Sequence, residues 1–455
     1  MPAPSRPNCH ACETPATAQH TVEMLNSECF CISLEEGAVK RAIALDLESS
    51  AVFGLIEERC PHLFSARPVF VSAGQSARMA QVVGAIEAVV KLPSYRARVL
   101  ARAPGIARHD PGGALGVFFG YDFHLDGERA GLIEINTNAG GAMLNAVLAR
   151  AQHACCVEMD YLQSGAGGAG RLEADIVAMF GDEWRRSGRT RALARIAIVD
   201  AAPRQQYLYA EFLLFQRLFE RAGIAAVIAD PSELAWRDGA LWHADGEVDL
   251  VYNRLTDFML EAPASAALRA AYLARAVVLT PHPQAHALYA DKRNLALLTD
   301  QRVLDELGVP AALQEILLAN IPRTEIVQIA HAERLWQERR KLFFKPAAGY
   351  GGRAAYRGDK LTKRVWQEII EGGDYIAQEI VTPGARVSGT ADSPLQYKFD
   401  IRNYTYDGQV QWTAARVYQG QTTNFRTEGG GFAPVYSIGD DDLRLREALR
   451  AASGG

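Results

Sequence analysis

The sequence has little of what marks a secreted or membrane protein. No run of apolar residues approaches the length of about 18 that a membrane-spanning helix needs. The opening residues, MPAPSRPNCHACETP, lack the apolar core of a secretory leader. Cysteine is scarce as well, with an odd number of seven in 455 residues, which argues against a disulfide framework. We therefore expect a cytoplasmic protein with no membrane partner.

A surplus of positive charge is also missing. The chain has 48 Lys and Arg against 53 Asp and Glu, a formal net charge of -5, so bulk electrostatics gives no reason to expect nucleic-acid binding. Its 49% hydrophobic and 22% charged residues are ordinary for a globular protein, and its length allows two or three domains. We therefore expect no nucleic-acid partner.

Four of the cysteines occur in two close pairs near the N-terminus. Cys9 and Cys12 lie in CHAC, and Cys29 and Cys31 lie in CFC. Thiolates at such spacings can hold zinc, although the second spacing is tight. Ordinary reduced thiols explain the same residues, and the sequence leaves both interpretations open.

The chain alternates helical and strand patterns in a way that predicts a mixed α/β (α+β) fold. Apolar residues recur at helical spacing from 76 to 92, and two strand-like runs then meet at the polar turn Asp126-Gly127. Between about 190 and 285, RIAIVDAA, an amphipathic helix ending at Gly223 and IAAVIADPSEL follow one another. Strand, helix and strand at this spacing predict a parallel βαβ unit, with a further strand in VDLVYNRLTDF.

The stretch GLIEINTNAGG, 131–141, places an acid and an amide inside a strand-forming run. Successive side chains of a strand alternate between its faces, so Glu134 and Asn136 point the same way. Carboxylate and amide oxygens are ligands that magnesium prefers. An edge strand with two solvated polar residues would explain the pair equally well.

Three later segments carry groups suited to a nucleotide. FFKPAAGYGGRA has Lys345 ahead of a glycine-rich loop that could approach phosphates, or that could be a plain hairpin turn. YIAQEIV has a polar strand end that could line a base, and KFDIRN has alternating charges, usually the sign of a solvated face. The candidate residues in these segments are Lys345, Gly349, Tyr350, Gly351, Gly352, Gln378, Glu379, Ile380, Val381, Asp400 and Arg402.

The order of these segments resembles the ATP-grasp superfamily, especially glutathione synthetases, ribosomal-protein glutamate ligases and D-alanine ligases. A lysine, a glycine-rich loop, a QE strand, a DxR strand and AARVYQGQTTNFRTEGGG follow one another as they do there. ADKRN resembles a further element of these families, whose lysine, Lys292 here, binds phosphate. The resemblance covers about residues 195–436 and implies ATP as a ligand of the segments named above.

The metal-binding end of such enzymes normally follows the glycine-rich segment near the C-terminus. Here GYDFHLDGERAGLIEINTNAGG, at 120–141, resembles it instead, which implies a circularly permuted ATP-grasp fold. The resemblance then assigns Asp122, Glu134 and Asn136 to Mg²⁺. It divides the chain into a permuted N-terminal part at 1–165, a pre-ATP-grasp Rossmann-like α/β domain at 190–285 and an ATP-binding part at 286–455.

The activity that the resemblance implies joins a small carboxylate to an amine through an acyl phosphate, at the expense of ATP. Arg402 and Arg416 are the candidates for stabilising charge during catalysis. The substrate candidates are Asn253, Arg254, Asn424 and Arg426. Alternatives are a phosphotransferase or a non-catalytic nucleotide-binding protein on the same scaffold, and a homodimer is a reasonable expectation.

Overall fold

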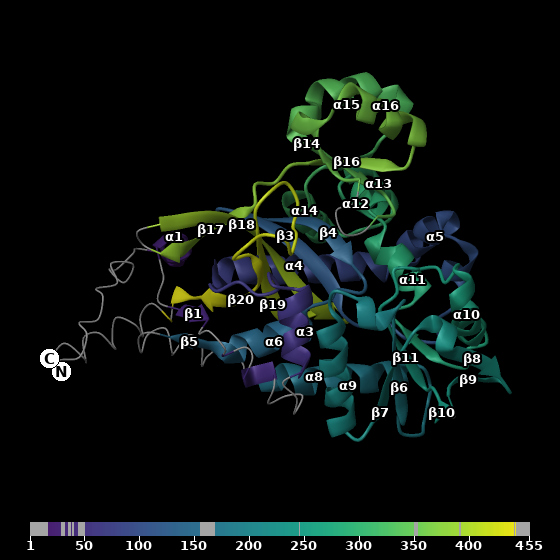
Figure 1. Ribbon diagram of the computed structural model, residues 1–455. Helices are drawn as coiled ribbons and strands as arrows, with labels where there is room; N and C mark the ends of the chain where they lie inside the picture. The colour runs from purple at the N-terminus through teal and green to yellow at the C-terminus, as the bar shows by residue number, and fades with distance from the viewer. Residues whose placement is uncertain are drawn as a thin grey trace, which may run out of the picture.

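The computed structural model describes residues 17–28, 32–34, 38, 41–43, 51–154, 169–244, 246–349, 354–390, 393–440 and 442. The four cysteines considered for zinc, Cys9, Cys12, Cys29 and Cys31, lie outside these residues. In the described part, helices and strands form a mixed α/β structure built around a large sheet, a parallel sheet and a small sheet (Figure 1). The predicted fold class is thereby confirmed.

The parallel sheet has the strand order β12-β11-β6-β7. Its strands are β6 (Arg195–Val199), β7 (Ala225–Ala229), β11 (Leu250–Asn253) and β12 (Val278–Thr280). Helix α9 (Tyr209–Arg221) connects β6 to β7 and packs on one face, and α10 (Ala266–Leu273) belongs to the apolar cluster on the other. Alternate residues of β6 face these two clusters, Ile196 and Ile198 one and Ala197 and Val199 the other. The predicted βαβ unit is confirmed.

The large sheet joins strands from both ends of the chain. Its order is β2-β20-β19-β18-β3-β4, and β17 pairs with β18 beside β3. The strands are β2 (Val69–Ser72), β3 (Phe119–Asp126), β4 (Arg129–Asn136), β17 (Gly384–Thr390), β18 (Ser393–Tyr406), β19 (Gln409–Tyr418) and β20 (Gly431–Ile438). The hairpin β3–β4 turns at the predicted place, and β3 pairs antiparallel with β18 over Phe119–Phe123.

Helices cover both faces of the large sheet. One face carries α4 (Ala73–Val90) and α14 (Ala311–Asn320), and the other carries α6 (Ala142–Ala151) and α8 (Ala169–Arg186). The helix predicted from residue 76 is confirmed as α4, which begins slightly earlier because Ser72 and Gln75 form a capping box at its N-terminus.

The small sheet stands apart at the top of Figure 1. Its order is β13-β16-β14-β15, with strands β13 (Thr324–Ile326), β14 (Leu342–Pro346), β15 (Tyr356–Arg357) and β16 (Tyr375–Glu379). Helices α15 (Ala332–Glu338) and α16 (Lys363–Gly372) form its own apolar cluster with it. Because this core is separate from those of the two larger sheets, the small sheet is a distinct layer above the rest of the protein.

The remaining elements are short connections and terminal pieces. The α-helices are α1 (Ala18–Glu28), α3 (Ala51–Arg59), α5 (Pro93–Arg102), α11 (Pro283–Ala285), α12 (Arg293–Leu298) and α13 (Gln301–Glu306). The strands are β1 (Ile32–Leu34), β5 (Gln152–Ala154), β8 (Leu234–Arg237), β9 (Ala240–His243) and β10 (Gly246–Glu247). The 3-10 helices are η2 (Gly105–Arg108), η3 (Pro203–Gln205), η4 (Pro231–Glu233), η5 (Pro263–Ser265), η7 (Ile329–His331), η8 (Arg339–Lys341) and η9 (Gly358–Lys360), and η6 (His286–Ala290) is a π-helix.

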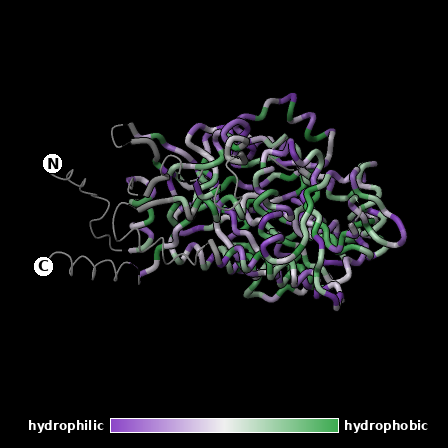
Figure 2. Tube along the Cα trace, turned by 60° about the horizontal axis from the view of Figure 1, so that its bottom comes forward, coloured by the Kyte–Doolittle hydropathy of each residue, from purple (hydrophilic) through white to green (hydrophobic). Residues whose placement is uncertain are grey.

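Hydrophobic segments run through the body of the protein, and hydrophilic stretches are prominent along its outer loops (Figure 2). Among the helices of the described residues, none combines the length and apolar character required to cross a bilayer.

Candidate functional site

A cleft of about 570 Å³ lies where the three sheets come together. Strands β4, β18 and β19 of the large sheet contribute to its wall, as do β14 and β16 of the small sheet. The rest of the lining includes residues that follow β6 and β11 of the parallel sheet. Chain segments more than 250 residues apart therefore share one cavity.

A row of charged residues crosses the large sheet at the edge of this cleft. Strand register places Asp122 opposite Glu134 on one side and opposite Arg402 on the other. The Asn136 amide donates to Asp122 Oδ2 at 3.1 Å and to Glu134 Oε1 at 3.1 Å. The structure thus brings together the three residues predicted to bind Mg²⁺.

Asp122 is fully buried and is held by two arginines. Arg402 donates through Nε and Nη2 at 2.6 and 2.7 Å, and Arg416 donates through Nη2 at 2.8 Å. Arg416 also donates through Nε to Asp400 at 2.7 Å, because Asp400 lies opposite it on β18. Both guanidinium groups line the cleft in an orientation fixed by these carboxylates.

Two lysines lie on the same side of the cleft as Glu134. Lys292 Nζ is 3.9 Å from Glu134 Oε2 and donates to Gly349 O at 2.6 Å. Lys345 Nζ donates to Ile133 O at 3.0 Å and to Gln378 Oε1 at 2.8 Å. Burial opposes the ionisation of Glu134, yet Lys292 and Lys345 hold its pKa well below the usual range. Burial lowers the pKa of Lys345 to about 8, against the attraction of Glu134.

The predicted base-binding strand end lines the cleft through Gln378, Glu379, Ile380 and Val381. Part of its backbone is already engaged, since Glu379 N donates to Arg323 O at 2.9 Å and Ile380 N to Lys341 O at 3.0 Å. His124 Nδ1 lies 2.8 Å from Val381 O and ties this segment to β3. The strand end is thereby anchored to both the small and the large sheet.

The opposite end of the cleft is bounded by the parallel sheet and by aromatic rings. Arg254, directly after β11, donates through Nη1 to Asn138 O at 2.8 Å and to Tyr252 Oη at 3.3 Å. Asp200, directly after β6, also lines the cleft. Aromatic residues of the cleft lining include Tyr207, Phe212, Phe258 and Phe425, and the Phe212 ring centroid lies 5.7 Å from Arg254 Cζ.

Several predicted residues lie away from the lining or outside the described chain. The Asn253 amide is used within the fold, donating to Pro281 O at 3.1 Å and accepting from Leu255 N at 3.1 Å. Asn424 accepts from Arg426 N at 2.9 Å and donates to Gln419 O at 2.9 Å, so it shapes its own loop. The residues that do not line the cleft are Asp122, Asn253, Asp400, Asn424 and Arg426, and those outside the described residues are Tyr350, Gly351 and Gly352.

Sequence reasoning missed Asp200, His124 and the aromatic residues of the cleft lining. Asp200 could have been found, because it directly follows the buried strand RIAIV. The carboxyl ends of parallel strands are where ligands bind in open α/β sheets. His124 and Phe425 carry no comparable local signal, since their places in the cleft depend on contacts with distant segments.

The donor set fits Mg²⁺ in part. Glu134 and Asn136 both line the cleft and carry side-chain oxygens, and Mg²⁺ commonly takes one or two protein ligands and completes its shell with water and phosphate oxygens. Asp122 does not fit in this arrangement, because both of its oxygens already accept hydrogen bonds from arginines. Over the described residues, no group of three or more His, Cys, Asp or Glu side chains is arranged to hold a metal ion.

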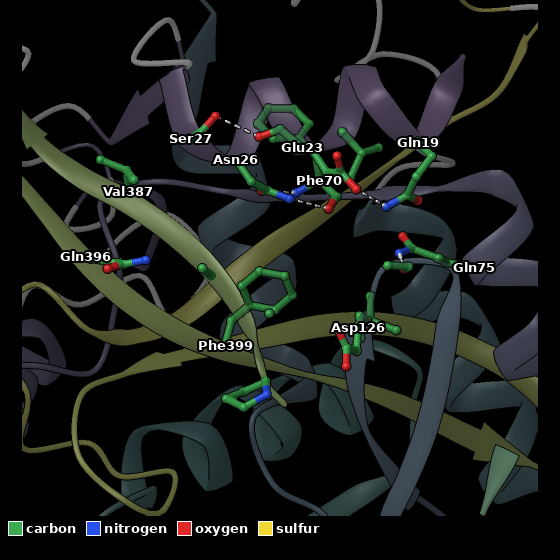
Figure 3. A pocket seen from close by; sticks show the side chains of 16 residues that line it. Gln19, Glu23, Asn26, Ser27, Phe70, Gln75, Asp126, Val387, Gln396 and Phe399 are labelled. Atoms are coloured by element: carbon green, nitrogen blue, oxygen red, sulfur yellow. Dashed lines mark hydrogen bonds between the residues drawn. The ribbon is translucent and has the colours of Figure 1, made fainter. Parts of the chain in front are cut away.

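A second cavity of about 310 Å³ lies between α1 and the sheet (Figure 3). Its wall includes Phe70 and Phe399, and its polar Asn26 is engaged with the backbone of Phe70 in two hydrogen bonds of 2.9 and 3.0 Å. Pro383 lines both this cavity and the main cleft. The second cavity has no cluster of cations comparable to that of the main cleft among its lining residues.

Comparison with solved structures finds similar folds. A glutathione synthetase-like effector from Globodera pallida, solved in its apo form, has a TM-score of 0.52 at 12% identity, over 82% of this chain and 90% of that chain. A putative gamma-glutamylcysteine synthetase from Methylobacillus flagellatus has a TM-score of 0.43 at 11% identity, over 80% and 87%. The ATP-grasp ligase PsnB, complexed with minimal precursor, Mg and ADP, has a TM-score of 0.29 at 14% identity, over 57% and 98%.

No protein-family model matches the chain, and no curated protein does. The likeness to the glutathione synthetase-like effector, at 12% identity, is a likeness of fold.

Proposed function

We propose that this chain is an ATP-dependent ligase that joins a carboxylate to an amine, with Mg²⁺ as its metal. The observation that carries the proposal is a cluster of four cations in one cleft. Lys292 and Lys345 act on Glu134, and Arg402 and Arg416 bind the neighbouring Asp122. Phosphoryl transfer needs chiefly positioning and the neutralisation of spreading negative charge, which such a set supplies. The fold shared with a glutathione synthetase-like effector supports the same proposal.

Each group has a role in this proposal. Lys292 and Lys345 bind phosphate oxygens, and the strand end Gln378–Val381 binds the base. Glu134 and Asn136 hold Mg²⁺, which supplies positive charge next to the phosphates when bound. Asp122 fixes Arg402 and Arg416 so that their charge faces the reacting carboxylate. In the reaction, the substrate carboxylate takes the γ-phosphoryl group and releases ADP; the amine then attacks the acyl phosphate, giving the amide, phosphate and a proton.

We also propose the domain division and circular permutation implied by the motifs. The hairpin β3–β4, which carries the metal candidates, pairs with β18 although it precedes β18 by more than 250 residues. This supports residues 1–165 as a permuted part of the ATP-binding domain formed by 286–455, with 190–285 as the pre-ATP-grasp domain. Permutation is tolerated when the original ends of a domain lie close together.

The test is ADP release from Mg·ATP with a matrix of small carboxylates, amino acids, short peptides and amines. A ligase releases ADP at a high rate only when an acid and an amine are both present. Equal release with a single substrate would instead indicate a phosphotransferase, and nucleotide binding without turnover in any mixture would indicate a binding protein. A Glu134→Gln variant, expected to release ADP about tenfold or more slowly, serves as the control.

A further inference from the structure

The end of the cleft next to the parallel sheet contains a carboxylate that the proposed reaction does not use. Asp200 follows β6 directly, is only 8% exposed and lines the cleft. The hydrogen bond that the structure gives it comes from the adjacent backbone, from Ala201 N to Oδ1 at 2.8 Å. Burying a carboxylate that accepts so few hydrogen bonds costs the folded state free energy, unless a bound ligand supplies a positive charge or further donors.

The nearest positive charge does not satisfy Asp200. Arg254 acts on it electrostatically, but its guanidinium donates to Asn138 O and Tyr252 Oη and lies 4.0 Å from Glu211. Among the described residues, no lysine or arginine forms an ion pair with Asp200. Burial accordingly raises the pKa of Asp200 to about 6, above its ordinary range. An uncompensated buried acid in a cleft is characteristic of a functional site.

The aromatic residues that line the same cleft favour an organic cation. Tyr207 and Phe425 pack with ring centroids 5.7 Å apart, and Phe258 stacks on His286 at 3.7 Å. Aromatic faces attract cations and pack against the carbon chain that carries them. Among the described residues that follow β6 and β11 and line the cleft, Asp200 supplies the carboxylate, and one strong acceptor is enough for an ammonium group.

We propose that Asp200 binds the ammonium group of the acid substrate, so that the enzyme takes an amino acid or a peptide with a free amino group. The substrate carboxylate then points towards Arg402 and Arg416, and its ammonium end lies at the carboxyl ends of β6 and β11. The inference rests on the proposed function, because that function places the reacting carboxylate at the arginines.

The assignment also has a chemical consequence. An ammonium group paired with a carboxylate keeps its proton, and a protonated amine has no lone pair with which to attack an acyl phosphate. Asp200 would therefore keep the amine of the activated substrate from attacking that substrate's own acyl phosphate. The incoming amine, which must lose a proton to react, belongs elsewhere in the cleft.

The experiment measures binding of free and N-acetylated probes in the absence of nucleotide. Each of the common amino acids, and a set of short peptides, is titrated calorimetrically near pH 8, together with its N-acetyl form. At least one free probe should bind about tenfold or more tightly than its acetylated form, since only the free ammonium group can form a charged hydrogen bond with Asp200. Asp200→Asn should abolish this preference.

The matched control is Asp238→Asn. Asp238 is an exposed acid in the β8–β9 turn of the same domain, with φ of 53°, a conformation that asparagine tolerates. This variant should keep the preference for the free amine. Equal binding of free and acetylated probes to the unmodified protein, an undiminished preference in Asp200→Asn, or no binding of any probe would each overturn the inference.

Nucleotide binding, followed separately with a non-hydrolysable ATP analogue and Mg²⁺, distinguishes this result from the failure of the proposed function. If the analogue does not bind but the free-amine preference depends on Asp200, the ligase proposal fails and the ammonium site stands. If the analogue binds and no free-amine preference exists, the ammonium site fails and the ligase proposal stands.

Discussion

Asp200→Asn should stabilise the protein at the same time as it removes a binding group. The folded-state pKa of Asp200 is about 6, against an ordinary value of 3.8, because burial disfavours the charged form. A group with a raised acid pKa binds more protons in the folded state between these two values, so stability falls as pH rises through that window. Above it, the ionised carboxylate costs the folded state about 3 kcal/mol, at about 1.4 kcal/mol per pKa unit.

The neutral amide that replaces the carboxylate in Asp200→Asn removes that cost and keeps the shape of the side chain. We expect the variant to gain up to about 3 kcal/mol in unfolding free energy at pH 8, about half of that at pH 5, and little below pH 4. Urea unfolding followed by tryptophan fluorescence measures the difference at each pH. Asp238→Asn, which removes an exposed charge, should change stability by less than about 0.5 kcal/mol.

A loss of stability in Asp200→Asn at pH 8, or a gain that does not shrink at low pH, would refute the reasoning. The first result would mean that the ionised carboxylate supports the folded state through its contacts. The second would mean that the gain comes from something other than the ionisation of this group.

Three further predictions concern the rest of the site. Glu134→Gln should lower Mg²⁺-dependent ADP release by about tenfold or more, while Glu128→Gln, exposed in the turn of the same hairpin, should not. Nucleotide affinity measured by calorimetry should fall as pH rises through about 8, because Lys345 then loses its charge, and Lys345→Arg should remove that dependence. Glu211→Ala should cost about 2–4 kcal/mol in urea unfolding, since the fully buried Glu211 accepts from Gly141 N at 2.8 Å and Met143 N at 3.2 Å.

The local part of the site was predictable from the sequence because strand geometry is local. The two-residue period places Glu134 and Asn136 on one face of β4, and the structure has them within hydrogen-bonding distance at 3.1 Å. The hairpin turn at Asp126-Gly127 and the helix α4 follow from patterns within short windows. Such features depend on neighbours in the chain and not on the tertiary fold.

The pairing of charges across the sheet was not predictable in the same way. Asp122 receives hydrogen bonds from Arg402 and Arg416, which lie 280 and 294 residues away. Those contacts depend on strand register between opposite ends of the chain, which no local pattern encodes. Asn253 shows the same limit. Its position at a strand end was predicted, but not that its amide donates to Pro281 O and accepts from Leu255 N within the fold.

Asp200 lies between these two cases. A polar residue directly after a buried parallel strand is a general signal for a ligand-binding edge, and RIAIVD carries it. The sequence alone does not show that Asp200 lacks an ion-pair partner. That depends on the fold, in which Arg254 donates to Asn138 O and Tyr252 Oη instead.

The most direct test of the account is a structure of the protein with Mg²⁺ and a non-hydrolysable ATP analogue. We predict the triphosphate between Lys292 and Lys345, and a metal ion about 2.1 Å from oxygens of Glu134 and Asn136. A metal ion or triphosphate more than about 10 Å from Glu134 would contradict the assignment of this cleft, and with it the proposed ligase.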